Sequence, residues 1–145
     1  TLVKQWELTD IVASYGYINC INSDIAAIAS LDAIFLCDSK NGEIRKSFPY
    51  HRIVSALFEQ NQEDLKLKTS VKDMIYNNLS NELVIALSVN NSVNNKIAII
   101  YINVLTSTYE IVEIQEVYEI DNIKLFSLNG QIRAIFDNYE ITLDK

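Results

Sequence analysis

The sequence has few of the residues that bind metals or carry out nucleophilic catalysis. Its 145 residues include two cysteines and one histidine. Zinc sites use three or four Cys, His or carboxylate ligands at characteristic spacings, which Cys20, Cys37 and His51 do not provide. A catalytic Ser or Cys usually needs a His base, and His51 is the single candidate, toward Cys37 or a serine. We interpret His51 as a connector residue beside Pro49 and Tyr50, and we expect no metal, no cofactor, no catalytic residue and no enzymatic activity.

Glycines are also scarce, and this excludes a phosphate-binding loop. Gly16, Gly42 and Gly130 stand far apart, whereas such loops need clustered glycines. Four glutamates lie close together, but alternation along a strand turns them to different sides, so we expect a solvated rim and no catalytic carboxylate pair. They are Glu110, Glu113, Glu116 and Glu119. Three aspartates lack the spacing of a calcium loop, and we interpret them as turn-stabilising side chains. They are Asp24, Asp32 and Asp38.

The charge balance and the length of the apolar runs limit the partners. The formal net charge is -7 and the basic residues are scattered. Without a basic stripe we expect no direct nucleic-acid binding. The longest apolar runs, 83–87 and 97–102, are far shorter than the roughly 20 residues that cross a bilayer, so we expect no membrane span. Two isolated cysteines are typical of buried thiols in a reducing compartment, which predicts a nuclear or cytoplasmic protein.

Short runs rich in Ile, Val, Tyr and Phe between polar breaks predict antiparallel strands joined by hairpins. Asn41-Gly42 and Asn129-Gly130 each lie between two such runs, where a tight turn needs positive φ angles. Residues 59–78 are polar and charged, and we interpret them as a surface insertion with a helical turn over 70–79. The chain begins inside an expected strand, residues 1–8, so we interpret it as a fragment or a processed product.

A degenerate repeat gives the most informative pattern, because repeats of about 40 residues with four strands each indicate propeller blades. Residues 25–48 resemble the second to fourth strands of a WD-repeat blade, with Cys37-Asp38 in the place of the family's Trp-Asp pair. Three other pairs take the equivalent third-strand place in this alignment. They are Trp6-Glu7, Tyr101-Ile102 and Phe136-Asp137. The family's Gly-His pair is missing, so the Asp of its His-Ser/Thr-Asp-Trp network has no His partner.

The resemblance implies an all-β fold, namely part of a β-propeller in which about three antiparallel four-stranded blades form an incomplete ring. Residues 1–8 would end one blade, 17–48 would form a second, 53–114 a third with the insertion 59–78, and 123–143 part of a fourth. A narrower resemblance is to the carboxy-terminal half of the non-catalytic WD-repeat subunit of tRNA guanine-N7 methyltransferase. Ribosome-assembly scaffold propellers are equally similar, because no diagnostic motif separates them.

Together these features predict a non-catalytic protein-interaction scaffold in a nuclear or cytosolic multi-subunit complex, with complexes that act on RNA among the candidates. Its partners would be other protein subunits, including the one that completes the ring. Exposed aromatic residues in loops often anchor interfaces. We therefore expect interface residues at Tyr15, Tyr50, Arg52 and Tyr76. The alternative is a self-contained β-sandwich or barrel that binds a small ligand, since short strands with regular turns also suit such folds.

Overall fold

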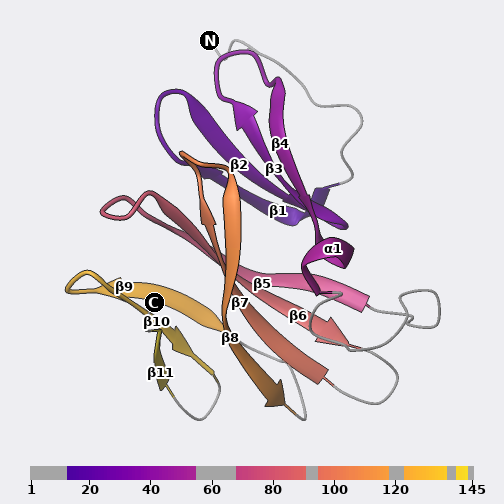
Figure 1. Ribbon diagram of the computed structural model, residues 1–145, viewed down its shortest axis with the longest axis vertical. Helices are drawn as coiled ribbons and strands as arrows, with labels where there is room; N and C mark the ends of the chain where they lie inside the picture. Colours follow the sequence, from indigo (N-terminus) through magenta and orange to yellow (C-terminus); the bar gives the residue numbers. More distant parts are fainter. Residues whose placement is uncertain (1–12, 55–67, 91–94, 118–122, 137–139, 144–145) are drawn as a thin grey trace. The chain divides into compact units, whose positions relative to one another are not determined.

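The computed structural model describes residues 13–54, 68–90, 95–117, 123–136 and 140–143. The chain divides into two compact units, Thr1–Leu57 and Phe58–Lys145. Most of the described residues lie in strands of three antiparallel sheets (Figure 1). The predicted all-β class is therefore confirmed.

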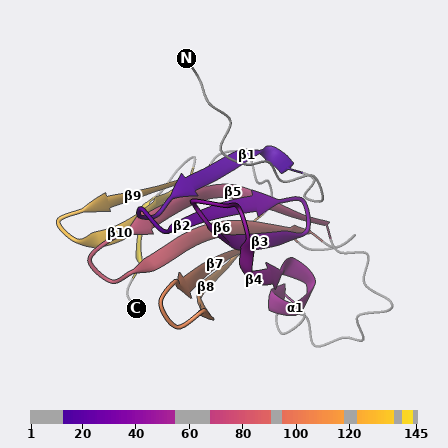
Figure 2. The same cartoon turned by 90° about the horizontal axis from the view of Figure 1, so that it is seen from above.

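The first unit contains a four-stranded meander, which we call the first sheet. Its strands are β1 (Ala13–Cys20), β2 (Ile25–Ser30), β3 (Ala33–Asp38) and β4 (Ile44–Pro49), paired in that order. β4 is an edge strand whose exposed Arg45 and Lys46 disfavour pairing with another chain. The helix α1 (Tyr50–Val54) follows β4 directly (Figure 2). The third blade, expected to begin at residue 53, does not begin with a strand there, because Ile53 and Val54 are helical and buried. Residues 55–58 lie outside the described part.

The second unit contains a second four-stranded meander, the second sheet. Its strands are β5 (Lys68–Asn77), β6 (Glu82–Asn90), β7 (Asn95–Asn103) and β8 (Thr108–Val117). The helical turn predicted over 70–79 is wrong, and the described part of the predicted insertion is β5, which pairs along its length with β6. The register shifts between Val71 and Asp73, which makes Lys72 a bulge residue. This extra residue interrupts the two-residue alternation and conceals the strand in the sequence.

The third sheet, also in the second unit, has three strands. They are β9 (Lys124–Leu128), β10 (Gln131–Ile135) and β11 (Glu140–Leu143), with β10 in the middle. Leu128 pairs with Gln131 across a two-residue turn in which Asn129 and Gly130 have φ angles of 51° and 81°. Positive φ at both positions is the type I′ hairpin that the Asn-Gly pair predicts. The hairpin prediction is therefore confirmed.

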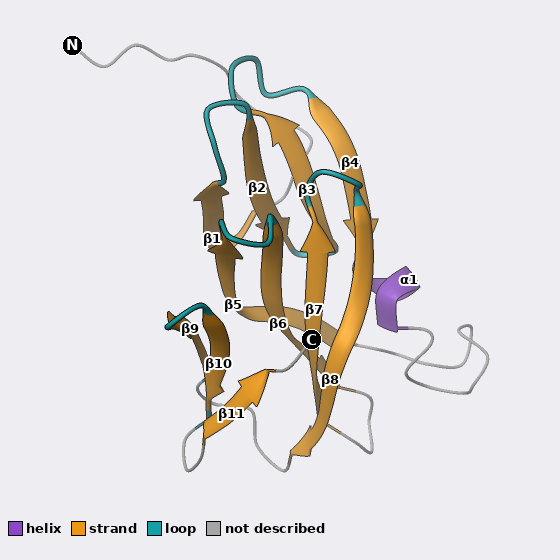
Figure 3. Cartoon of the chain, turned by 60° about the vertical axis from the view of Figure 1, so that its left-hand side comes forward, coloured by secondary structure: helices purple, strands orange, loops and turns teal. Residues whose placement is uncertain are grey.

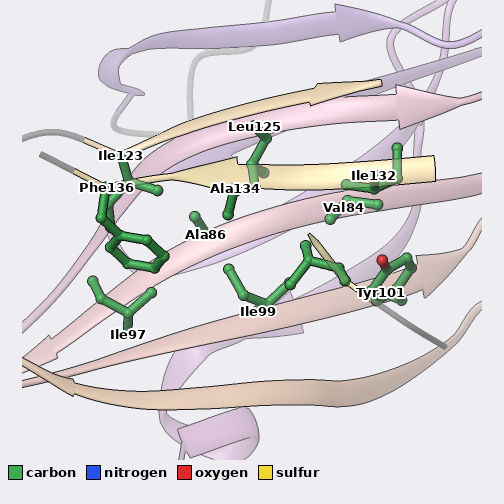
Figure 4. Close-up of a cluster of buried hydrophobic side chains, with 11 residues drawn as sticks. Val84, Ala86, Ile97, Ile99, Tyr101, Ile123, Leu125, Ile132, Ala134 and Phe136 are labelled. Carbon is green, nitrogen blue, oxygen red and sulfur yellow. The ribbon is translucent and has the colours of Figure 1, made fainter. Parts of the chain in front are cut away.

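The second and third sheets pack face to face around one hydrophobic core (Figure 4). The second sheet contributes Val84, Ala86, Ile97, Ile99 and Tyr101, and the third contributes Ile123, Leu125, Ile132, Ala134, Phe136 and Leu143. The side chains of β6 and β7 that alternate with these are equally buried, so both faces of these inner strands are shielded from water. Strands that are buried on both faces have near-continuous apolar sequences, as β6 and β7 do.

The third sheet packs on the second sheet with β9 against β5 and β10 over β6. The Asp73 carboxylate of β5 accepts the Leu125 N–H of β9 at 2.8 Å, which places β9 against β5. The β9–β10 turn lies against the β5–β6 turn, since a Cβ built on Gly130 would be 3.7 Å from Cδ1 of Leu79. Ala134 of β10 lies over Ala86 of β6 in the core (Figure 4).

This stacking changes the predicted position of Phe136. Phe136 follows β10, and β10 lies over β6, which is the second strand of its sheet. The prediction that Phe136 takes a third-strand place is therefore wrong, because the two sheets align from their first strands. The companion residue Asp137 and the predicted residue Trp6 lie outside the described part of the chain.

Candidate functional site

Asp38 builds the turn between β3 and β4. Its Oδ1 accepts the N–H groups of Lys40 at 2.8 Å and of Asn41 at 3.3 Å. Its main-chain carbonyl accepts the N–H of Gly42 at 2.8 Å, and Gly42 has a φ of 74°. The aspartate side chain thus satisfies backbone donors that the end of the strand leaves unpaired, which confirms its predicted turn-stabilising role.

Asn103 builds the same turn between β7 and β8. Its Oδ1 accepts the N–H groups of Leu105 at 3.0 Å and of Thr106 at 3.1 Å. Its carbonyl accepts the N–H of Ser107 at 2.9 Å, and Ser107 has a φ of 56°. Five residues therefore repeat one hydrogen-bond pattern in two sheets, with Asn103 in the place of Asp38. The β3–β4 and β7–β8 turns are drawn in teal in Figure 3.

A further pair of hydrogen bonds supports this equivalence. The residue after the third strand donates its N–H to the carbonyl of the residue before the second strand in both sheets. In the first sheet Ser39 donates to Asp24 at 2.9 Å, and in the second sheet Val104 donates to Asn81 at 3.1 Å. The ends of the two central hairpins are thus built alike.

The equivalence shifts the predicted repeat by one residue. With Asp38 matched to Asn103, the partner of Cys37 is Ile102 and not the predicted Tyr101. A shift of one residue along a strand moves a side chain to the opposite face. The prediction for Tyr101 is therefore wrong in register, although Tyr101 does lie in the third strand of its sheet.

Cys37 and Asp38 differ in their electrostatic surroundings. Cys37 is fully buried, and burial raises the pKa of its thiol, which keeps it protonated and a poor nucleophile at neutral pH. The Arg45 guanidinium donates to Oδ2 of Asp38 at 2.7 Å. This hydrogen bond, with those from the Lys40 and Asn41 N–H groups, holds the pKa of Asp38 below its ordinary value.

Tyr50 was expected at an interface, but the structure places it in the core of the first unit. Its side chain is 2 % exposed, and its hydroxyl donates to the carbonyl of Ser30 at 2.9 Å. The Ser30 hydroxyl in turn donates to Oδ1 of Asp32 at 2.9 Å. Burial, followed by the Asp32 charge, raises the pKa of Tyr50. The interface prediction is wrong for Tyr50, because the β2–β3 turn uses its hydroxyl as an internal tie.

The other three predicted interface residues lie apart from one another in the chain and do not form one cluster by their described contacts. Arg52 is exposed on α1, next to the exposed His51. Tyr76 is half-buried in β5, not in a connector, and its hydroxyl is 3.2 Å from Oδ1 of Asn81. Tyr15 belongs to β1, and its side chain lies outside the described part.

The open edge of the third sheet is a candidate interaction site that the sequence did not reveal. Among the described residues, β11 pairs with β10 alone. The Leu125 N–H points away from β10, to Asp73, so Leu125 and its partner Ala134 form a non-hydrogen-bonded pair. Because such pairs alternate in antiparallel sheets, Ala134 forms its backbone hydrogen bonds with Ile141 of β11. The main-chain groups of Thr142, the next residue, therefore point to the open edge. The main-chain groups of Glu140 and Thr142 therefore have no partner strand within the part of the chain that the structure describes.

A polar hollow of about 260 Å³ lies in the second sheet. It is lined by Lys68, Thr69, Ser70, Lys72, Ser88, Asn90 and Asn95. The sequence analysis missed it because residues 68–72 were assigned to a surface insertion. Had β5 been recognised, the two-residue period would have placed Ser88 and Asn90 on the face of Val84 and Ala86.

Two searches of the described residues give negative results. No three His, Cys, Asp or Glu side chains within this part of the chain gather closely enough to hold a metal ion. None of its helices has the length and apolar character needed to cross a membrane.

Comparison with known proteins gives no further guide, since no family model, no curated protein and no solved structure matches the chain significantly.

Proposed function

We propose that the chain is a non-catalytic scaffold of the β-propeller type, which binds other protein subunits in a nuclear or cytoplasmic complex. The observation that carries the proposal is the repetition of one structural unit. Two sheets are four-stranded meanders with matching third-strand turns at Asp38 and Asn103. In a β-propeller, each blade is a four-stranded sheet of this kind that packs against the next blade.

The stacking in the second unit supports the same proposal. β9 lies against β5 and β10 over β6, so consecutive sheets align in order and direction. Repeat proteins stack in this way because each unit buries its apolar face against the next one.

The first unit supplies a stand-in for the missing histidine network of the WD-repeat family. Ser30 ends the second strand, Asp32 lies in the following turn, and Tyr50 follows the fourth strand. Hydrogen bonds join Tyr50 to Ser30 and Ser30 to Asp32. A tyrosine hydroxyl thus ties the β2–β3 turn to the segment after β4.

Among the described residues, the third sheet has an open edge at β11 that can take a partner strand. An unpaired strand edge exposes a row of N–H and C=O groups, which are satisfied by water or by an added strand. We propose that a strand of another polypeptide, or of another part of the same protein, pairs with β11 at Glu140 and Thr142 and completes the sheet.

The test is analytical ultracentrifugation of the full chain and of two variants at Thr142. We expect the chain to self-associate with rising concentration, because in a solution of the isolated chain the open edge of β11 can pair with another copy. Thr142→Pro removes the outward N–H while the bonds of Ile141 and Leu143 to β10 remain, and we expect it to weaken association. Thr142→Val keeps the N–H and serves as the control.

A monodisperse monomer over the whole concentration range would overturn the proposal. It would favour the alternative, a self-contained β-sandwich, because the face-to-face packing of the second and third sheets also suits that fold. Association that Thr142→Pro leaves unchanged would place the interaction at another surface. Far-UV circular dichroism of both variants checks that the strands are retained.

A further inference from the structure

The polar hollow has a lining that suits an anion. Each of its seven residues carries an N–H or O–H donor, and none is an Asp or Glu. This selection is notable in a chain with 19 acidic and 12 basic residues. Lys68 and Lys72 bring two positive charges, and the serine, threonine and asparagine side chains add neutral donors. A negatively charged ligand matches this lining better than a neutral or cationic one.

The position of the hollow follows from the register of the second sheet. Ser70 pairs with Ser88 and Lys68 pairs with Asn90. Ser88 lies two residues after Ala86, so it is on the face that the third sheet covers. The face is apolar at Ala86, beneath the third sheet, and polar from Ser88 onward. The hollow is therefore the polar continuation of the core face.

Ser88 places a hydroxyl at the border of the hollow, in a residue that is 7 % exposed. A ligand oxygen in the hollow can accept a hydrogen bond from this hydroxyl.

We propose that this hollow binds the phosphoryl group of a small phosphate monoester. Lysine ammonium groups bind phosphate as point charges, and hydroxyl and amide donors complete the coordination of its oxygens. A volume of about 260 Å³ admits a phosphoryl group with a short organic substituent. It lies below the roughly 300 to 1,000 Å³ of sites for drug-sized ligands. The site belongs to one unit and does not depend on the completion of a ring.

The test is an NMR titration of the ¹⁵N-labelled full chain with glycerol 2-phosphate, and in a parallel arm with inorganic phosphate. We expect saturable shifts of the Lys68, Ser70 and Ser88 amides below about 50 mM ligand, because millimolar affinity requires only a few kcal/mol. Saturation by inorganic phosphate alone would overturn the monoester and leave a free phosphate site. Sodium chloride at the same ionic strength should give no saturable shift.

Variants separate a built site from general charge attraction. We expect the double substitution Lys68→Gln and Lys72→Gln to weaken binding at least ten-fold. Lys46→Gln and Lys124→Gln, at exposed lysines of β4 and β9, are the matched controls and should leave the affinity unchanged. Equal loss in the controls, or no saturable shift in the wild-type chain, would overturn the proposal.

Ser88→Ala tests the site without changing its charge. We expect binding to weaken about three- to ten-fold, since one hydrogen bond to a charged group is lost. An unchanged affinity in this variant would overturn the role of the buried hydroxyl. Because Ala is smaller than Ser and apolar, this variant is expected to fold even where the double lysine variant does not, and the dispersion of its amide spectrum checks this.

Discussion

The carboxylate of Asp73 and the backbone N–H of Leu125 lie 2.8 Å apart, and this hydrogen bond joins two sheets of the second unit. Asp73 is half-buried in β5, and Leu125 is part of the hydrophobic core. The same carboxylate accepts the N–H of Met74 at 2.9 Å. A single side chain therefore satisfies a donor on an outer strand edge and fixes how two stacked sheets align.

Replacing Asp73 should loosen the contact between the second and third sheets. We expect Asp73→Ala to cost about 1.5 to 3 kcal/mol, because a hydrogen bond to a charged group is lost and the Leu125 N–H is left unpaired. Asp73→Asn keeps an acceptor oxygen and should cost less. Amide hydrogen exchange at Leu125 measures the effect directly. Asp24→Ala, which removes an exposed carboxylate 3.3 Å from Lys40, is the control and should cost well under about 1 kcal/mol.

The matching turns of the first and second sheets predict opposite effects of two exchanges. Ser107 has a φ of 56° and Gly42 a φ of 74° at equivalent positions. We expect Ser107→Gly to stabilise the chain by about 0.5 to 1 kcal/mol, because glycine relieves the strain of the left-handed conformation. The larger conformational entropy of glycine in the unfolded chain offsets part of this gain. Gly42→Ser should destabilise it by at least about 1 kcal/mol. Calorimetric unfolding of both variants measures these changes, and the same sign for both would contradict the equivalence.

The ion pair of Asp38 with Arg45 predicts a dependence on acid pH. The hydrogen bond from the Arg45 guanidinium holds the pKa of Asp38 below its ordinary value in the folded chain. A lowered pKa means that its contribution to stability is present above about pH 4 and is lost as the pH falls through the folded value. In Asp38→Asn the turn keeps its Oδ1 acceptor, as at Asn103, but the charge is absent.

We therefore expect the difference in melting temperature between the wild type and Asp38→Asn to shrink as the pH falls from 7 to below about 4. High salt should reduce the same difference at neutral pH, because the pair is partly exposed. Thermal unfolding followed by circular dichroism provides the measurement. A difference that stays constant over this pH range would show that the carboxylate charge does not stabilise the turn.

Tyr50 should act as a structural tie and not as a binding residue. We expect Tyr50→Phe to destabilise the first unit by about 1 to 2 kcal/mol, because the ring stays packed while the hydrogen bond to the Ser30 carbonyl is lost. The raised pKa of Tyr50 means that its stabilisation is complete below about pH 10 and is lost at higher pH. Absorbance at alkaline pH should show the late ionisation of Tyr50, and this feature should be missing in the variant.

The sequence by itself determined the local structure of turns that are stabilised by their own residues. Asn129-Gly130 predicts a two-residue hairpin because few residue pairs adopt positive φ twice, and Asp38 predicts a turn because its carboxylate reaches nearby N–H groups. The alternating apolar runs likewise predict short antiparallel strands. These features depend on a few adjacent residues, so they can be recognised before any tertiary contact is known.

Only the tertiary structure decided which positions correspond between sheets and which polar residues matter. The bulge at Lys72 breaks the alternation of β5, and a composition rich in Lys, Ser and Asp is acceptable in an edge strand whose partner supplies the backbone hydrogen bonds. The contact of Asp73 with Leu125 joins β5 to β9, and the hollow beside Ser88 is lined by residues of β5, β6 and β7. Their formation depends on register, and a shift of one residue turns every side chain to the other face.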